Sequence, residues 1–482
     1  MDFGRKKTQK YTFKRPKLED LRTLGSLVVD TEAFSKRYGH LLSLLKINMT
    51  NGLLSTLFQF YDPVYHCFTF PDYQLMPTLE EYSHLIGVPI SSQAPFYGLE
   101  EDPKDQDIAK ATHLKMSEIR DHMTTKGKML GLTAKFLMNK AQYFARMRSV
   151  DAFEAVFALL IYGLFLFPSF DDFVAMDAIK IFLIGNPVPT LLADAYHSVH
   201  MRNSNSGGMI TCCMPMLYKW FISHLPMSHA FWDLKDGLLW SHKIMSLTHS
   251  DIVWYSRDYD GVSIIDSYGG FPNVPLLGTK GGISYNPILA RRQLGYPMRD
   301  KPKNIHLEGL FFKDCEDCKV LKEKIVHAWR HVHKLEKKVL GKTNCVSLEP
   351  YLKWVQDRAI NLKIPYPRQE PLPLVDKKHT YIFMIDVEKL KIALTKAQRE
   401  RDAWKNKYQI INNEDEELQR KLTMKIKEEL SNKKRKVQED LFSFGVQSDT
   451  PWKLIVDNLV LEKVEMEEQI KKLNLRLLGE SP

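Results

Sequence analysis

Apolar residues recur at spacings of three and four along most of the first 365 positions. One such run consists of Phe34, Tyr38, Leu41, Leu42 and Leu45. This spacing places apolar side chains on one face of a helix, and residues 129–200 and 209–250 continue it. Residues 91–128, which begin with acidic and polar positions, are expected to form a surface insertion. The pattern predicts a mainly α, multi-helix globular domain.

Residues 251–285 have a different pattern, with short β-branched or aromatic runs bounded by glycine, aspartate and proline. Such runs predict a small β element inside the helical domain. A second extended or hairpin element is expected before position 78. There Thr78 can act as the N-cap of a helix, and Glu81 can complete a capping box. Gly87 then follows the predicted end of that helix.

The stretch VFALLIYGLFLFP, residues 156–168, is the most apolar part of the chain. Its unbroken apolar run is shorter than the roughly 20 residues that cross a bilayer. Asp151 and Glu154 precede it, and Pro168 closes it. We interpret it as the most buried helix in the core of a soluble protein. No membrane partner is therefore expected.

The composition divides the chain into five parts. Residues 1–17 are a basic tail that we expect to be disordered, and residues 18–365 form the helical domain. Residues 366–383 contain a proline-rich linker. Residues 384–440 and 452–478, rich in Lys, Glu, Gln and Leu, are predicted to be a coiled coil and a second coiled-coil helix.

Both C-terminal helices contain a repeat of alternating four- and three-residue spacings. The first run is Leu390, Leu394, Ala397, Arg401, Trp404, Tyr408, Ile411, Asp415, Leu418 and Leu422, and the second is Trp452, Val456, Leu459, Lys463, Met466, Ile470, Leu473 and Leu477. These are the seam positions of a coiled coil. A single long helix folded back on the domain is the alternative, but the apolar stripe is narrow, which favours the coiled coil.

The coiled coil has two possible arrangements, because Gly445 and Pro451 should break the helix between the two runs. One is a long parallel dimer and the other is an antiparallel hairpin within one chain. We favour the dimer, since Arg401 and Asp415 at seam positions are easier to tolerate in a partly solvated two-stranded interface.

The net charge of +10 is compatible with nucleic acid or a nuclear setting without requiring either. Two compact basic segments, Arg5, Lys6 and Lys7 and then Lys433, Lys434, Arg435 and Lys436, are candidate nuclear import signals. The first can also be read as a nucleic-acid-binding arm, and both can be solvated surface. The basic N-terminus lacks the apolar region of a signal peptide. The six scattered cysteines favour a reducing compartment. We therefore expect the nucleus, and otherwise the cytoplasm.

A cluster of potential zinc ligands lies within two dozen positions. It consists of Cys315, Cys318, His327, His331 and His333. Only eight residues separate Cys318 from His327, fewer than the dozen of a zinc finger. Cys318 also belongs to an apolar helical stripe that runs from there to Val339, and His327 and His331 point away from that stripe. We expect an amphipathic helix over about 316–340 and no metal.

Other candidate chemistries are weak. His197 and His200 lack a nameable third ligand, and the glycine-rich LLGTKGG at 276–282 lacks the spacing of a phosphate-binding loop. The candidate acids for a nuclease are Asp171, Asp172, Asp177, Asp194, Asp251 and Asp266. Such an enzyme needs two or three of them to converge, and Asp266, at the end of a predicted strand, is the best of them. We assign no catalytic residue and no cofactor.

Four stretches occurring in order carry a family resemblance. They are MPTLEEYSHLIGVPI (76–90), LLWSHKIMSLTHSDIVWY (238–255), YNPILARRQLGYP (285–297) and IVHAWRHVHK with LEPYLKWVQDRA (325–359). Over residues 18–365 the chain resembles a plant family related to the plant mobile domain of transposable elements and host nuclear proteins. The resemblance implies a helical domain, a nuclear or transposon-linked origin and a role in genome silencing or maintenance. That group is sometimes described as aminotransferase-like, but no cofactor-binding lysine motif is present here.

Arg291, Arg292 and Gln293 are the most recognisable point of the resemblance, and we expect both arginines on the surface as part of a binding face. A structural salt bridge is the alternative. Two functions follow. One is a non-enzymatic, transposon-derived nuclear interaction protein whose coiled coil self-associates or recruits protein partners. The other is a transposon-derived DNA-binding factor or a nuclease- or transposase-like enzyme.

Overall fold

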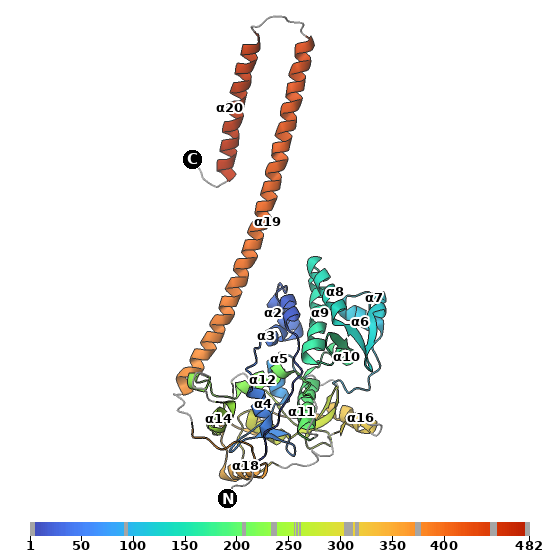
Figure 1. The fold of residues 1–482 in the computed structure, drawn as a ribbon, viewed down its shortest axis with the longest axis vertical. Coiled ribbons are helices and arrows are strands. Elements are labelled where there is room, and N and C mark those ends of the chain that lie inside the picture. The colour runs from blue at the N-terminus through green and yellow to red at the C-terminus, as the bar shows by residue number, and fades with distance from the viewer. Residues whose placement is uncertain are drawn as a thin grey trace. The chain divides into compact units, whose positions relative to one another are not determined.

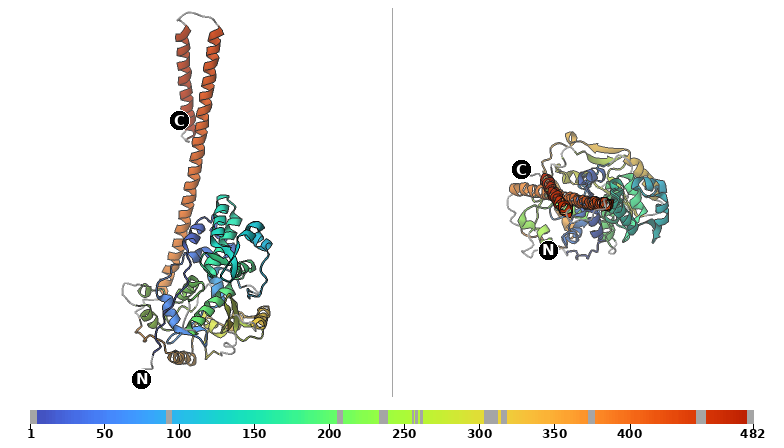
Figure 2. Two further views of the ribbon diagram at one scale, coloured as in Figure 1. Left: turned by 45° about the vertical axis from the view of Figure 1, so that its right-hand side comes forward. Right: turned by 90° about the horizontal axis from the view of Figure 1, so that it is seen from above.

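The computed structural model divides the chain into two compact units, Met1–Tyr381 and Ile382–Pro482 (Figures 1 and 2). The described residues are 5–90, 95–204, 209–232, 239–254, 256, 259, 262–302, 312–313, 318–371, 377–443 and 451–477. The first unit holds the apolar core, and the described residues of the second unit are helical.

The first unit is mainly helical, as the apolar spacing predicts. Its helices are α1 (Glu19–Gly25), α2 (Thr31–Tyr38), α3 (Leu41–Leu45), α4 (Leu53–Leu57), α5 (Leu79–Ile86), α6 (Asp105–Thr112), α7 (Met116–His122), α8 (Ala134–Arg146), α9 (Val150–Ile161), α10 (Met176–Ile184), α11 (Val188–Ser204), α12 (Met214–Ser223), α13 (His229–Trp232), α14 (Trp240–Met245), α15 (Pro287–Gln293), α16 (Cys318–Trp329), α17 (Lys337–Leu340) and α18 (Glu349–Asn361). Two long helices follow, α19 (Lys377–Ser443) and α20 (Pro451–Leu477).

Short strands form small antiparallel sheets in the described part of this unit. The strands are β1 (Tyr61–Asp62), β2 (Cys67–Thr69), β3 (Gln74–Leu75), β4 (Met123–Lys126), β5 (Met129–Thr133), β6 (Phe173–Ala175), β7 (Ile264–Tyr268), β8 (Val274–Gly278), β9 (Gly281–Tyr285), β10 (Phe312–Lys313) and β11 (Val332–Leu335). Their orders are β1-β2-β3, β4-β5-β6, β8-β9-β10 and β7-β11. The predicted small β element is thus confirmed over residues 264–285, and further strands occur elsewhere.

Helix α9 is the centre of the N-terminal half of the unit. Every residue from Ala152 to Ile161 is buried, as expected for a helix that is apolar on all faces. Helix α8 packs along it (Figure 1). A π-helical turn, Tyr162–Leu166, follows α9. Its Gly163 allows β6 to approach, because a Cβ there would lie 2.6 Å from Val174. The prediction of a buried core helix is confirmed, and no helix of the described residues is long and apolar enough to span a membrane.

Helix α11 is the corresponding element of the second half, and it packs on β8 and β9. Its buried Asp194 holds the two-residue turn between these strands. The Thr279 backbone N donates to Asp194 Oδ1 at 2.8 Å, and the Thr279 hydroxyl donates to Oδ2 at 2.9 Å. The glycine-rich LLGTKGG is therefore a hairpin, which agrees with the absence of P-loop spacing.

The capping box before α5 is present as predicted. Thr78 Oγ1 accepts from the Glu81 backbone N, and Glu81 Oε2 accepts from the Thr78 backbone N. Gly87 ends the helix with φ +71°, a left-handed conformation that favours glycine. These features depend only on neighbouring residues, which is why the sequence reveals them.

Three sequence expectations about elements are wrong. Residues 123–133 form the β4–β5 hairpin, with Gly127 at φ +62° in its turn, where a surface insertion and then helix were expected. Helices α6 and α7 each bury an isoleucine, Ile108 and Ile119, so this region contributes to the core. The third concerns the helix expected over 316–340. It ends at Trp329, because residues Val332–Leu335 pair instead with the open edge of β7.

The N-terminal tail also differs from what the sequence predicts. Residues 5–17 are ordered along the first unit, where disorder was expected. The Lys14 backbone N donates to the Ile210 carbonyl and the Ile210 N to the Thr12 carbonyl, both at 2.9 Å. The Gln59 side chain exchanges two hydrogen bonds with the backbone of Gln9. These bonds replace contacts with water and fix the segment, which we call the N-terminal arm.

Candidate functional site

Arg292 lies inside the first unit, with 2% of its surface exposed. Its guanidinium stacks 3.7 Å from the centre of the Trp254 ring, and its Nη1 donates to the Cys345 carbonyl at 2.9 Å. Burial lowers the pKa of Arg292 from 12.5 to about 10. The expected surface position is wrong for Arg292, because an aromatic face replaces water around the planar guanidinium.

Gln293 is buried as well, within a network that joins several segments. Its amide nitrogen lies 2.7 Å from His224 Nε2, and its Oε1 accepts from the Met76 backbone N at 3.3 Å. His224 Nε2 in turn lies 2.7 Å from Glu81 Oε1, while its Nδ1 lies 2.8 Å from the Val253 carbonyl. The network connects α5, α15 and the end of α12, so Gln293 holds the core together.

Arg291 retains partial exposure, with 29% of its side chain accessible. It forms an ion pair with Asp266, the carboxylate singled out from the sequence. His333 Nδ1 lies 3.6 Å from the other Asp266 oxygen. Asp266 is thus engaged by Arg291, as in the salt-bridge alternative. A binding role for Arg291 stays a prediction, but the three residues do not form one exposed face.

The other singled-out acids have partners of their own. Lys14 binds Asp171 at 2.7 Å, and Lys17 binds Asp172 at 3.5 Å. The hydrogen bond from Lys14 lowers the pKa of Asp171. Across the described residues, no group of three His, Cys, Asp or Glu side chains is arranged to hold a metal ion. The convergence that a metal-dependent nuclease needs is therefore not seen in that part of the chain.

The cysteine and histidine cluster is divided between two elements. Cys318 begins α16, whose inner face buries Ile325 and Trp329. His327 is exposed on that helix, while His333 is exposed on β11. Cys315 lies outside the described residues, so the absence of a metal here stays a prediction.

His197 and His200 lie on α11, and the fold brings a third histidine, His66, close to His200. The ring of His66 lies 5.0 Å from that of His200, and His66 Nδ1 donates to the Ser284 carbonyl at 2.6 Å. Burial lowers the pKa of His200 to about 4 and also lowers the pKa of His66. Both rings are therefore neutral at pH 7.

The N-terminal arm carries a row of exposed cations. They are Arg5, Lys6, Lys7 and Lys10. Its aromatic residues face inward instead. Tyr11 donates its hydroxyl to the Phe58 carbonyl at 3.0 Å, and the Arg202 guanidinium lies 5.2 Å from the centre of the Tyr11 ring. The arm thus presents its charges from a fixed backbone.

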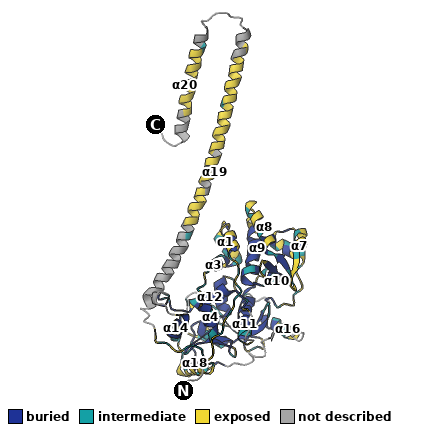
Figure 3. Cartoon of the chain, viewed as in Figure 1, coloured by how far each residue is buried: buried dark blue, intermediate teal, exposed yellow. Residues whose placement is uncertain are grey.

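Most of the described residues of α19 and α20 are exposed (Figure 3). Lys433, Lys434, Arg435 and Lys436 are exposed on α19. The exposed apolar seam residues among the described positions are Trp404, Tyr408, Leu418, Leu422, Val456, Leu459, Met466 and Ile470. The helices begin and end close to the predicted ranges, although α19 begins at Lys377 and so includes part of the predicted linker.

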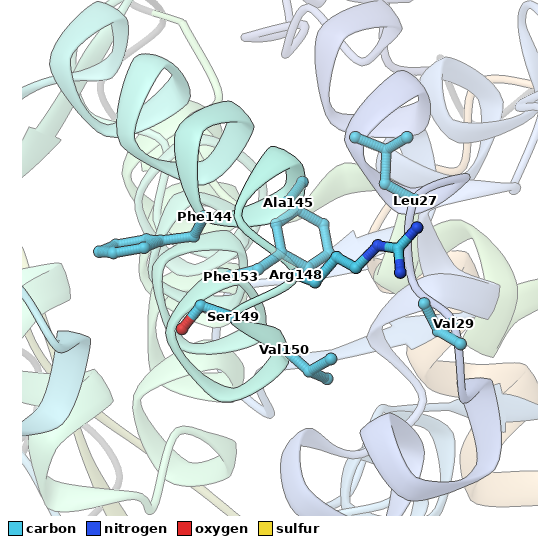
Figure 4. Close-up of a pocket in the computed structure, with 8 residues that line it drawn as sticks. All are labelled: Leu27, Val29, Phe144, Ala145, Arg148, Ser149, Val150 and Phe153. Carbon is cyan, nitrogen blue, oxygen red and sulfur yellow. The ribbon is translucent and has the colours of Figure 1, made fainter. Parts of the chain in front are cut away.

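A groove of about 260 Å³ lies in the first unit between the α1–α2 connection and the corner of α8 and α9 (Figure 4). It is lined by Leu27, Val29, Phe144, Ala145, Arg148, Ser149, Val150 and Phe153. No local sequence pattern predicts this groove, because its two walls come from segments more than a hundred residues apart. Exposed apolar side chains at Leu27 and Val29 are its main signal, and exposure cannot be read from one sequence.

Comparison with known proteins places the first unit in a family. Residues 21–360 match the sequence profile described as Domain of unknown function (DUF7745). The chain belongs to the DUF7745 family. Neither the curated proteins nor the solved structures gave a match. The matched region covers almost all of the first unit and ends with α18, so the family domain and the apolar core coincide.

Proposed function

We propose that this DUF7745 protein is a non-enzymatic nuclear interaction protein that pairs with a second copy of itself through α19 and α20. The resemblance of residues 18–365 to the plant-mobile-domain group supports a plant origin, derivation from a transposable element and work in the nucleus. In this proposal the first unit is the recruiting module, and the C-terminal helices bring two such modules together.

The exposure of the seam carries the proposal. Leu418 and Leu422 on α19 are 65% and 60% exposed, and Val456 and Leu459 on α20 are about as open. An apolar stripe in water gains about 25 cal/mol for each Å² that another helix covers. Because a long isolated helix gains little from a narrow stripe, a covering helix is the expected source of stability.

Charged pairs outside the seam support the same arrangement. Arg420 pairs with Glu416, and Lys421 pairs with Glu417, each one helical turn apart. Such pairs stabilise a helix by about 0.2–0.5 kcal/mol each. They leave the seam positions, including Leu418 and Leu422, available to a partner helix. A second copy is the occupant we propose, because it supplies the same seam with the same spacing.

Light scattering on the purified full chain tests the self-association. We expect the mass of a dimer for the natural chain and of a monomer for Leu418→Glu with Leu422→Glu. The matched control is Met424→Glu with Leu430→Glu, which changes exposed apolar residues of α19 outside the seam and should leave the dimer intact. A monomeric natural chain would favour the hairpin and contradict the proposal.

Nucleic-acid binding through the N-terminal arm is the second candidate function. The observation that favours it is the row of exposed cations Arg5, Lys6, Lys7 and Lys10, none of which has a carboxylate within 4 Å among the described residues. Unpaired cations on a fixed backbone can neutralise phosphates without losing an existing ion pair.

Fluorescence anisotropy with a labelled DNA duplex tests this second function. For each phosphate contact, the logarithm of the binding constant changes by about −0.9 per logarithm of salt concentration. Replacing Lys6, Lys7 and Lys10 with glutamine should lower that slope by up to about 3 units between about 50 and 200 mM salt. Replacing Lys433, Lys434 and Lys436 with glutamine removes the same charge elsewhere. If both variants lower the salt dependence of DNA binding equally, the DNA is attracted by the net charge of the protein and not by the arm.

A further inference from the structure

The groove of Figure 4 is lined mainly by apolar side chains from both of its walls. Phe153 of α9 is buried at its floor. Val29, on the opposite wall, is 85% exposed, and Leu27 and Val150 are also exposed. Tyr143 and Met147, which neighbour the groove residues Phe144 and Arg148 in the chain, are exposed as well. Several large apolar side chains exposed together indicate an interaction surface.

The charges around the groove are unbalanced. Among the described residues that line it, Arg148 alone is charged, and its side chain extends across the groove toward Leu27 and Val29 (Figure 4). Within the described part of the chain no carboxylate lies within 4 Å of Arg148. The nearby acids are engaged, because Arg37 binds both Asp151, at 2.5 Å, and Glu154, at 2.6 Å.

The local backbone fixes Arg148 at this place. The residue adopts φ +55° in the tight turn between α8 and α9, and its backbone N donates to the Ala145 carbonyl at 3.1 Å. The turn is closed by a second bond, from the Ser149 N to the Phe144 carbonyl at 2.9 Å. The backbone that carries the guanidinium is therefore fixed at this corner, so that binding a carboxylate orders only the Arg148 side chain.

We propose that the groove binds a segment of a partner protein in which a large apolar side chain lies beside a carboxylate. The apolar side chain would enter over Phe153 and between Val29 and Val150, and the carboxylate would bind Arg148. The volume favours a side chain over a whole small molecule, since sites for such ligands usually measure about 300–1,000 Å³. This interaction surface is separate from the seam of α19 and α20.

Selection of short random peptides displayed on phage, against the purified full chain, tests the proposal. We expect enriched peptides to carry an aromatic or branched apolar residue within a few positions of Asp or Glu. A synthetic peptide of the enriched sequence should bind Val29→Asp about tenfold more weakly, which corresponds to about 1.4 kcal/mol. The matched control is Val339→Asp, which changes a comparably exposed valine on α17 and should bind as the natural chain does.

A charge reversal at Arg148 distinguishes specific binding in the groove from nonspecific binding. Arg148→Glu should weaken the acidic peptide and select peptides in which Lys or Arg replaces the acid. Enrichment of peptides without an acid, or equal binding to all variants, would overturn the proposal. If Val29→Asp instead halves the mass of the full chain in solution, a second copy covers the groove, and the proposed partner is wrong. A natural chain that is a monomer in solution but still binds the peptide would contradict the proposed function and leave this one standing.

Discussion

Arg358 binds Asp62 with two parallel hydrogen bonds across 296 residues of chain, from Nε to Oδ2 at 2.6 Å and from Nη2 to Oδ1 at 2.7 Å. Asp62 is fully buried in the β1–β2 hairpin. The same carboxylate accepts from the Val64 backbone N at 3.0 Å. The pair thus fastens α18, the last helix of the family domain, to an early strand.

Removing Arg358 should destabilise the first unit strongly. Arg358→Ala leaves the Asp62 carboxylate buried without its cation, and breaking such a pair usually costs about 3–5 kcal/mol. Arg120→Ala is the matched control, because its pair with Asp105 is exposed and should contribute no more than about 1 kcal/mol. Urea unfolding followed by tryptophan fluorescence measures both. Equal losses in the two variants would contradict a buried role for the Asp62 pair.

Glu80 should make the first unit less stable as the pH rises toward neutrality. Burial raises the pKa of its carboxyl to about 7, from the ordinary 4.5, although the Ile265 backbone N donates to its Oε1 at 2.8 Å. The folded state then binds the proton more tightly than the unfolded state. The resulting stability is fully present below about pH 4.5 and is lost as the pH rises through about 7.

Glu80→Gln removes this titration and is the test. The variant should gain stability relative to the natural chain as the pH rises from about 5 to 8, by an amount on the order of 3 kcal/mol. Asp194, whose pKa burial raises to about 6, contributes in the same direction and is unchanged in the comparison. Glu323→Gln, at an exposed position of α16, is the control and should show the pH dependence of the natural chain. A constant difference between Glu80→Gln and the natural chain at every pH would contradict the shift.

The sequence predicts those parts of the fold that neighbouring residues determine. The Thr78–Glu81 capping box needs only residues three apart, and the core helix α9 follows from its unbroken apolar run. Strand β11 could not be predicted, because its partner β7 lies more than sixty residues earlier and its own residues continue a helical stripe. Tertiary pairing decided its conformation.

The candidate sites, like β11, depend on contacts between segments that are distant in the sequence. Two adjacent arginines favour a surface position, but Arg292 finds Trp254 and the Cys345 carbonyl, contacts that depend on the fold. The groove depends on the approach of Val29 and Phe153, which no local pattern connects. In contrast, the cations of the arm are exposed as the composition suggests, although their ordered backbone depends on Ile210 and Gln59.

Arg292 and Arg291 should therefore respond differently to substitution. Arg292→Ala leaves a cavity beside Trp254 and removes the bond to the Cys345 carbonyl, so we expect a loss of about 2–4 kcal/mol. Arg291→Ala breaks a partly exposed pair with Asp266 and should cost no more than about 1 kcal/mol. Thermal unfolding of both variants measures the difference. A small effect of Arg292→Ala with weaker partner binding would restore the surface interpretation.

Nuclear import should depend on the two exposed basic segments together. Arg5, Lys6 and Lys7 of the arm and the four cations at 433–436 are all accessible to a receptor. A fluorescent fusion in which both segments are changed to glutamine should move from the nucleus to the cytoplasm of a plant cell, and single-segment variants should show which of them dominates. The control fusion replaces Arg420, Lys421, Lys425 and Lys427, an equally exposed group on α19, and should stay nuclear. If the double variant stays in the nucleus, neither segment is the import signal. If the control fusion moves to the cytoplasm, net charge rather than a specific sequence determines the location.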